Sequence, residues 1–95
     1  PVRNGVYAAR VRIDGTEHEA VVNVGHRPTV GNGPDRVLEA HLLDFEGDLY
    51  GQTIEVELLE FLREERRFGS TEELSRQIEA DKKRARERLR RDSDL

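Results

Sequence analysis

The chain has 95 residues, enough for one domain, because single domains typically hold about 100–150 residues. Charged residues make up 38% of it, but the two signs nearly balance at a formal net charge of −4, which argues against nucleic acid as a partner. The absence of cysteine excludes a disulfide framework, a thiolate nucleophile and a cysteine-based metal site. No apolar run approaches the roughly 20 residues of a membrane span and no secretory signal is present, so we expect a cytoplasmic protein without membrane partners.

The first predicted elements are two strands joined by a tight turn, after a turn-like lead-in at residues 1–5. Residues 6–13 alternate in character, and the apolar row holds Tyr7, Ala9, Val11 and Ile13. Asp14 and Gly15 suit the positive φ angles of a two-residue hairpin loop, and residues 16–24 form the returning strand.

A loop rich in glycine and proline, NVGHRPTVGNGP, follows at residues 23–34. Gly25 permits a close approach to the backbone, and Pro28 stiffens the exit. Arg27 and Thr29 are suited to binding an anion or a ligand hydroxyl. Loops of this composition are also common as plain connectors, so the residues alone leave both interpretations open.

The central stretch, RVLEAHLLDFEGDLYG, is predicted to be a strand at residues 36–43 that runs into an acidic loop. Leu38, Ala40 and Leu42 share one face, whereas Glu39 lies on the other face among apolar neighbours. A buried carboxylate is costly unless it is paired or hydrogen-bonded, so Glu39 is either a functional residue or a strand residue that meets solvent. The acids of residues 44–51 do not fit a calcium loop, because the glutamate at the twelfth position and the flanking helices are missing.

A fourth strand and a helix complete the predicted order of four antiparallel strands followed by one helix. Residues 52–61 place Ile54, Val56 and Leu58 on the inward face of the strand. After a charged bend at residues 62–69, Ser70 and Glu73 form a capping box. The apolar face of the following helix is predicted to hold Leu74, Ile78, Ala85 and Leu89. Its basic last turns suit the helix dipole.

These residues resemble the riboflavin kinase domain found at the C-terminus of bacterial bifunctional riboflavin kinase/FMN adenylyltransferases, which are FAD synthetases. Five stretches carry the resemblance in the family's order and cover nearly the whole chain. They are NGVYA at 4–8, NVGHRPTVG at 23–31, LEAHLLDFEGDLYG at 38–51, FLREERRFGS at 61–70, and the closing helix with Leu74, Ile78 and Asp81. The resemblance implies a mainly β fold, an antiparallel Greek-key barrel of six strands, about four of them in this chain, with one C-terminal helix.

The resemblance also implies a reaction, the transfer of the ATP γ-phosphate to the 5′-hydroxyl of riboflavin, which gives FMN. Glu39 falls at the family's catalytic glutamate, the general base for that hydroxyl. Riboflavin, ATP and Mg²⁺ are the expected ligands, and an adenylyltransferase module is the expected neighbour. The resemblance implies flavin contacts from His41, Arg63, Glu64 and Phe68, and nucleotide contacts from Asp44, Phe45 and Tyr50. It places Asn23, Gly25, Arg27, Pro28 and Thr29 in a motif beside the active site, in which their individual roles stay open.

The sequence departs from the family pattern in one respect. The family's glycine-rich phosphate-binding segment and its Pro-Thr-Ala-Asn motif, whose Thr and Asn serve Mg²⁺–ATP, lie upstream of NGVYA, and neither occurs here. We therefore expect residues 1–95 to be the C-terminal portion of one riboflavin kinase domain, with no metal ligands of its own and little activity alone. The alternative is a catalytically incomplete β-barrel module that binds flavin or a protein partner. A small nucleic-acid-binding barrel is disfavoured by the acidic balance and by the few aromatic residues on the strands.

Overall fold

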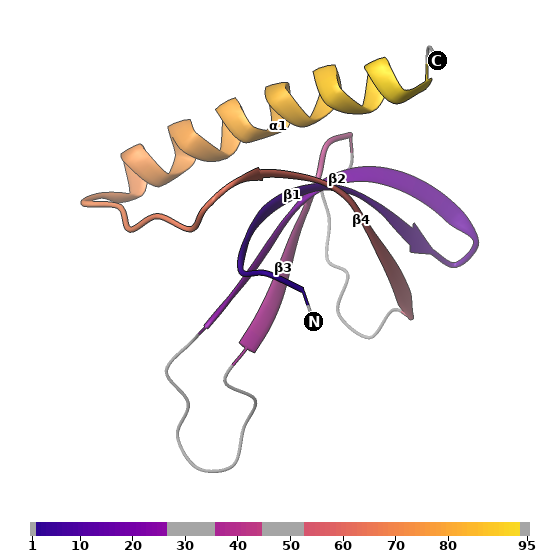
Figure 1. Cartoon of the computed structure of the whole chain (residues 1–95), viewed down its shortest axis with the longest axis horizontal. Coiled ribbons are helices and arrows are strands. Elements are labelled where there is room, and N and C mark those ends of the chain that lie inside the picture. Colours follow the sequence, from indigo (N-terminus) through magenta and orange to yellow (C-terminus); the bar gives the residue numbers. More distant parts are fainter. Residues whose placement is uncertain (1, 27–35, 45–52, 94–95) are drawn as a thin grey trace.

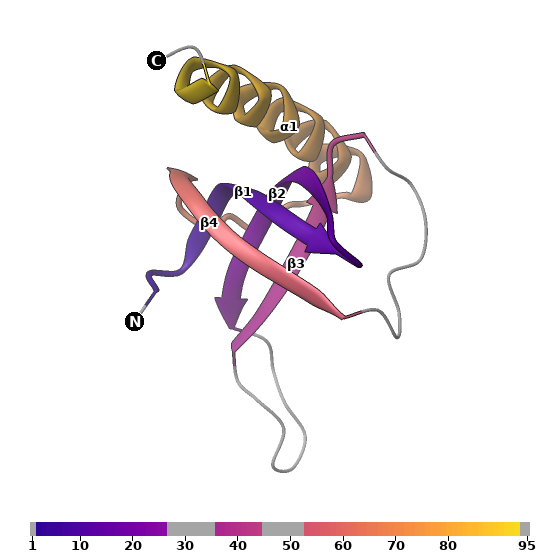
Figure 2. The same cartoon turned by 90° about the vertical axis from the view of Figure 1, so that its right-hand side faces the viewer.

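The computed structural model describes residues 2–26, 36–44 and 53–93. The elements are β1 (Gly5–Ile13), β2 (Thr16–His26), β3 (Arg36–Leu42), β4 (Ile54–Arg63) and α1 (Thr71–Ser93). The strands form one antiparallel sheet in the order β3-β2-β1-β4, and α1 lies across one face of this sheet (Figures 1 and 2). The prediction of a mainly β, antiparallel fold with a C-terminal helix is confirmed.

The hairpin of β1 and β2 closes through the predicted two-residue loop. Asp14 has a φ of 49° and Gly15 a φ of 85°, so both residues adopt the left-handed conformation that this loop type requires. Pairing continues without interruption from Ile13↔Thr16 to Gly5↔Val24. β2 itself runs to His26, so it extends two residues past its predicted end, into the glycine-containing stretch. The hairpin therefore forms the centre of the sheet, with β3 and β4 on its two edges.

The face of the sheet under α1 holds one of two apolar clusters. Because side chains alternate along a strand, Val6 and Ala8 of β1 point to this face, where Ala85 and Leu89 of α1 cover them. The full cluster is Val6, Ala8, Val21, Leu43, Leu62, Ala85 and Leu89. The helix thus packs on the row of β1 that the sequence pattern had left unassigned.

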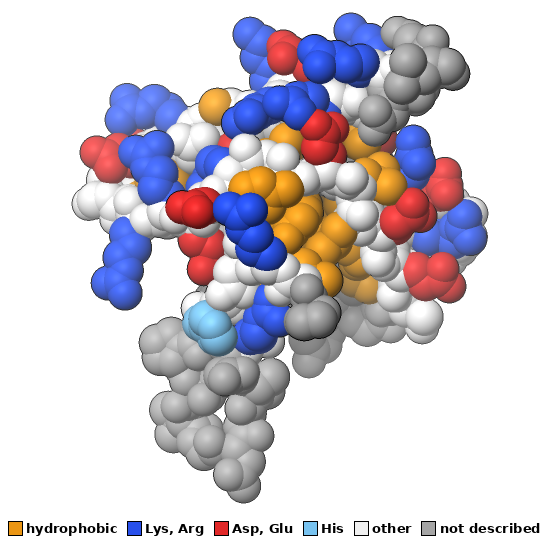
Figure 3. Space-filling model, in the orientation of Figure 1, with side chains coloured by type: hydrophobic (Ala, Val, Ile, Leu, Met, Phe, Trp, Pro, Cys, Tyr) orange, Lys and Arg blue, Asp and Glu red, His pale blue; other side chains and the backbone are white. Residues whose placement is uncertain are grey.

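The opposite face of the sheet holds the second cluster, built from the apolar row predicted for β1. Its buried members are Ala9, Val11, Ala20, Val22, Val24 and Leu42. Figure 3 shows hydrophobic side chains gathered below α1, where they remain visible at the surface. Leu38 and Ile54 are 45% and 39% exposed, so the predicted inward position of Ile54 is only partly realised. The sheet is therefore apolar on both sides, but α1 covers only one of them.

Helix α1 begins at the predicted cap. The Glu73 N–H donates to Ser70 Oγ at 3.1 Å, and Glu73 Oε2 accepts from the Gly69 N–H at 3.0 Å, one residue before the usual capping-box partner. The predicted apolar face is wrong at Leu74, which is 41% exposed, whereas Asp81 is buried in line with Ala85 and Leu89. Among the described residues, no helix is both long enough and apolar enough to cross a membrane.

Replacing Leu89 by Ala tests the contact between the helix and the sheet. Leu89 is fully buried, so its truncation leaves a cavity and should lower the free energy of unfolding by about 3 kcal/mol. Leu74→Ala removes the same side chain from an exposed position of the same helix and should cost less than about 1 kcal/mol. Urea unfolding of both variants measures the difference, and equal losses would contradict the packing described.

Candidate functional site

A pocket of about 210 Å³ lies where β2, β3 and the segment after β4 meet, on the face of the sheet that also carries α1. Its walls are formed by Asn23, Gly25, His26, Val37, Glu39 and Glu65. The strand register accounts for this grouping, because Asn23 pairs with Glu39, and Gly25 pairs with Val37. Three residues predicted from the sequence, Asn23, Gly25 and Glu39, therefore line one pocket.

Glu39 is positioned by the sheet itself. It lies in the middle of β3, is half-buried and points to the same side as His41 and Leu43. Across the strand pair, the Oδ1 atom of Asn23 is buried without a hydrogen-bond partner among the described residues. An unpaired buried acceptor is costly, and such atoms in a pocket are commonly satisfied by a ligand or by water. The pocket thus places a carboxylate and an unsatisfied amide oxygen side by side.

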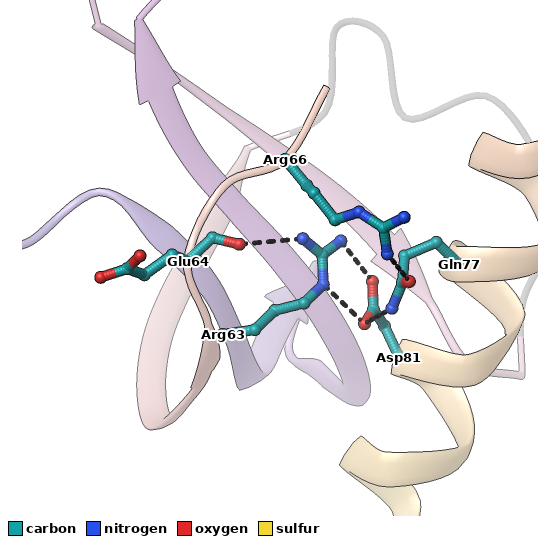
Figure 4. A network of polar contacts seen from close by, with 5 residues as sticks. All are labelled: Arg63, Glu64, Arg66, Gln77 and Asp81. Carbon is teal, nitrogen blue, oxygen red and sulfur yellow. Dashed lines mark hydrogen bonds and ion pairs between the residues drawn. The ribbon is translucent and has the colours of Figure 1, made fainter. Parts of the chain in front are cut away.

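The segment that follows β4 is attached to α1 by a buried ion pair. Arg63, the last residue of β4, donates to both carboxylate oxygens of Asp81, from Nε at 2.9 Å and from Nη2 at 2.8 Å (Figure 4). Its Nη1 donates to the carbonyl oxygen of Glu64 at 3.0 Å. Only 5% of the Asp81 side chain and 19% of the Arg63 side chain are exposed. Arg63, predicted as a flavin contact, is therefore a bridge between β4 and α1 in this structure.

Gln77 and Arg66 extend the same network along the segment. Gln77 Nε2 donates to Asp81 Oδ1 at 3.0 Å, and its Oε1 accepts from Arg66 Nη1 at 2.9 Å (Figure 4). The guanidinium of Arg66 also lies 5.2 Å from the ring centre of Phe68, within the range of a cation–π interaction. Segment 64–70 has no regular secondary structure, so these side-chain contacts hold it in place.

Gly25 permits a close contact between this segment and β2. A Cβ at Gly25 would lie 2.6 Å from the Cδ atom of Glu65 and closer still to its Oε1. Gly25 has an ordinary extended backbone, so the missing side chain matters here rather than a special φ angle. The close approach predicted for Gly25 is made by the Glu65 carboxylate.

His41 follows Glu39 on the same face of β3 and lies near α1. Burial and the positive charge of Lys82 lower the pKa of His41 from its ordinary value of 6.5, and Asp81 acts in the opposite direction. These surroundings therefore favour the neutral form of the imidazole over the charged one. Its predicted role as a flavin contact stays a prediction.

The remaining predicted site residues are dispersed or lie outside the described residues. The side chain of Glu64 is 80% exposed and is paired with Arg3 at 3.2 Å, and Phe68 is half-buried. Asp44 lies beyond the end of β3, with its carboxylate 3.9 Å from Arg86, and does not line the pocket of Glu39. The predictions for Arg27, Pro28, Thr29, Phe45 and Tyr50 fall outside the described residues.

Asp81 and Glu65 are two charged residues of the site for which the sequence predicted no role. Asp81 stands four residues before Ala85 and eight before Leu89, so its spacing puts it in the buried row of α1. A buried carboxylate needs a cationic partner, so the sequence did contain a signal for this residue. Glu65 offered no such sign. Its contact with Gly25 depends on where β4 ends and on how segment 64–70 crosses the sheet.

Comparison with known families and proteins finds riboflavin kinases among the relatives of this chain. The family model described as "Flavokinase: Riboflavin kinase" matches residues 1–89. The bifunctional riboflavin kinase/FMN adenylyltransferase of Escherichia coli K12 is 48% identical over 88 residues, which cover 92% of this chain and 28% of that protein. The corresponding protein of Pseudomonas fluorescens is 49% identical, with coverages of 81% and 25%.

Two further similarities come from proteins with other names. The RNA-binding riboflavin kinase RibR of Bacillus subtilis is 45% identical over 84% of this chain and 35% of that protein. A crystal structure titled as a macrolide-efflux protein from Streptococcus pneumoniae superimposes with a TM-score of 0.76 at 32% identity, over 87% of this chain and 27% of that one. The chain thus spans about a quarter to a third of the length of these relatives, whose names describe much longer proteins.

Replacing Asp81 by Asn tests the buried ion pair. The variant leaves the Arg63 guanidinium without its counter-charge in a buried site, and we expect the free energy of unfolding to fall by about 3 kcal/mol. Glu17→Gln breaks the Arg12–Glu17 pair, whose side chains are more than half exposed, and should cost less than about 1 kcal/mol. Similar losses in urea unfolding would show that the Asp81 carboxylate is not specially required.

His41 should make stability depend on pH. Because its pKa is lowered in the folded chain, the unfolded chain binds more protons between that value and 6.5. Stability should therefore fall as the pH is lowered from about 6.5 through the folded pKa, and His41→Gln should flatten this part of the curve. His26→Gln, at an exposed position, is the control. Thermal unfolding between pH 7.5 and 5.5 measures both, and an unchanged slope in His41→Gln would contradict the assignment.

Proposed function

Because the chain belongs to the riboflavin kinase family, we propose that it forms part of an enzyme that transfers the γ-phosphate of ATP to the 5′-hydroxyl of riboflavin to give FMN. The observation that carries the proposal is the pocket in which Glu39 lies beside the unsatisfied Oδ1 of Asn23. The pocket supports the choice of Glu39, because it brings this carboxylate next to an acceptor that a substrate hydroxyl could satisfy.

Glu39 is proposed as the general base. Phosphoryl transfer to an alcohol requires the hydroxyl to be held in line with the phosphate, and a nearby carboxylate to take its proton. A carboxylate in the middle of a paired strand keeps its position without having to be ordered at the moment of reaction. Asn23 Oδ1, on the neighbouring strand, would accept a hydrogen bond from the same polar part of the substrate.

Mg²⁺ is expected from the chemistry, but the described residues offer no ligand set for it. No group of three His, Cys, Asp or Glu side chains in this part of the chain is arranged to hold a metal ion. The Pro-Thr-Ala-Asn motif, from which the family's metal ligands are expected, does not occur in the 95 residues. The metal and the ATP phosphates are therefore not assigned to any residue of this structure.

An FMN adenylyltransferase module is proposed in the same natural polypeptide. Two relatives bear the name of the bifunctional enzyme, and the chain covers only about a quarter of each of them. Formation of FAD from riboflavin and ATP by the natural polypeptide would support this part of the proposal. A cytoplasmic location stays a prediction.

Glu39→Gln tests the proposed chemistry. In the natural polypeptide that carries this chain, supplied with riboflavin and Mg²⁺–ATP, the variant should lose at least about a hundredfold in kcat for FMN formation, because Gln cannot take the proton. Riboflavin binding and thermal stability should change little. Glu57→Gln, an exposed carboxylate on β4, should keep wild-type turnover.

The outcomes separate the kinase from the alternative of a non-catalytic module. A variant with turnover within about threefold of wild type would remove Glu39 from the mechanism. A wild-type polypeptide that binds riboflavin but forms no FMN would favour a flavin-binding module instead.

A further inference from the structure

The pocket beside Glu39 is rich in hydrogen-bond acceptors. The carboxylates of Glu39 and Glu65 both line it, and the Asn23 Oδ1 between strands β2 and β3 is buried without a partner in the described part of the chain. A carboxylate accepts several hydrogen bonds, so these groups together suit a ligand that donates several hydrogen bonds, or a cation. The described residues do not include three His, Cys, Asp or Glu side chains grouped to bind a metal, so a neutral donor fits this pocket better.

Glu65 reaches the pocket because of Gly25. Any side chain at position 25 would occupy the space of the Glu65 carboxylate, since a Cβ there would lie 2.6 Å from Cδ and 3.0 Å from Oε2. Gly25 has no positive φ angle that would call for glycine. The absence of a side chain at position 25 therefore leaves room for this carboxylate to line the pocket.

The backbone on both sides of Glu65 is anchored to α1. Arg63, two residues earlier, binds Asp81 with two hydrogen bonds and also holds the carbonyl oxygen of Glu64. Arg66, one residue later, donates to Gln77 (Figure 4). Glu65 thus lies in a short stretch fixed at each end, although its own side chain is at the surface.

We propose that Glu65 is a second substrate-binding carboxylate, which accepts hydrogen bonds from the hydroxyl groups of the ribityl chain while Glu39 takes the proton of the terminal hydroxyl. This inference rests on the proposed function and adds to it a residue that selects substrates with a polyhydroxylated chain. A ribityl chain presents several hydroxyl donors in series, which matches acceptors lining one pocket. The Glu65 contact would fix the chain and so position the terminal hydroxyl at Glu39.

Riboflavin and lumiflavin, which carries a methyl group in place of the ribityl chain, provide the test. We would measure both affinities by flavin fluorescence in the natural polypeptide that carries this chain. Glu65→Ala should weaken riboflavin binding about tenfold and leave lumiflavin binding unchanged, because only the hydroxyl contacts are lost. Glu72→Ala, an exposed carboxylate in the first turn of α1, should change neither affinity.

A double-mutant cycle checks the role of Gly25. Gly25→Ala should displace the Glu65 carboxylate and reproduce the loss of preference for riboflavin, whereas adding it to Glu65→Ala should cost nothing further, since the obstructing side chain is already gone. Additive losses in the double variant would overturn the contact as the cause. An equal weakening of riboflavin and lumiflavin by Glu65→Ala would show a structural effect and overturn the proposal.

Three further results would also decide against the proposal. If Glu65→Ala abolished Mn²⁺ binding to the flavin-free protein and left the flavin preference intact, Glu65 would be a cation ligand. If wild type made FMN but neither variant changed the preference, the inference would fail while the kinase proposal stood. If wild type neither bound nor phosphorylated riboflavin, both would fail together.

Discussion

The ion pair of Arg63 and Asp81 is the contact on which the arrangement of this chain most depends. It joins the last residue of β4 to the middle of α1, across the edge of the apolar cluster that holds Leu89. A buried pair contributes little net stability, but it is costly to break, because the charge left behind is poorly solvated and has no counter-charge. Both Asp81 oxygens and all three guanidinium nitrogens of Arg63 have partners, so the pair has one well-satisfied geometry. The position of the helix and the path of segment 64–70 are therefore set together.

The two carboxylates of the pocket are held in different ways as a consequence. Glu39 is fixed by the hydrogen-bond ladder between β2 and β3, which does not depend on the helix. Glu65 lies on a stretch without regular structure, and its position follows from the contacts of Arg63 and Arg66 with α1. A shift of α1 would thus move the Glu65 carboxylate but would have little effect on the position of Glu39. The structure separates the group proposed for chemistry from the group proposed for substrate selection.

Local patterns were sufficient for much of the fold. Asp14 and Gly15 define their turn through backbone conformations that few residues adopt, and Ser70 with Glu73 defines the start of the helix through bonds within four residues. The prediction failed where distant parts of the chain decide. Leu74 has helical spacing but lies in a turn that no part of the described sheet covers, whereas Asp81 is buried because Arg63, 18 residues away, neutralises it.

The candidate site shows the same division. Glu39, Asn23 and Gly25 could be brought together from family motifs, because each lies in a stretch with a distinctive sequence. Glu65 also lies in a family stretch, FLREERRFGS, but its place in the pocket could not be predicted, since its approach to Gly25 joins residues 40 positions apart through the tertiary structure. Sequence patterns describe what a residue does within its own element. They do not predict which distant segment will contact a given residue, as segment 64–70 contacts Gly25.

The register of β3 finally determines whether the site exists. Alternate residues of this strand point to opposite faces of the sheet, so that Leu42 joins the second apolar cluster while Glu39 faces the pocket. A shift of the strand pairing by one residue would exchange these two rows and place the Glu39 carboxylate on the face of the second apolar cluster. Contacts at both ends of the strand oppose such a slip. Arg36 donates to Asn4 Oδ1 at 2.7 and 3.0 Å, and the Leu43 N–H donates to the Glu19 carbonyl oxygen at 2.9 Å. The position of the proposed base is thus specified by residues that take no part in its chemistry.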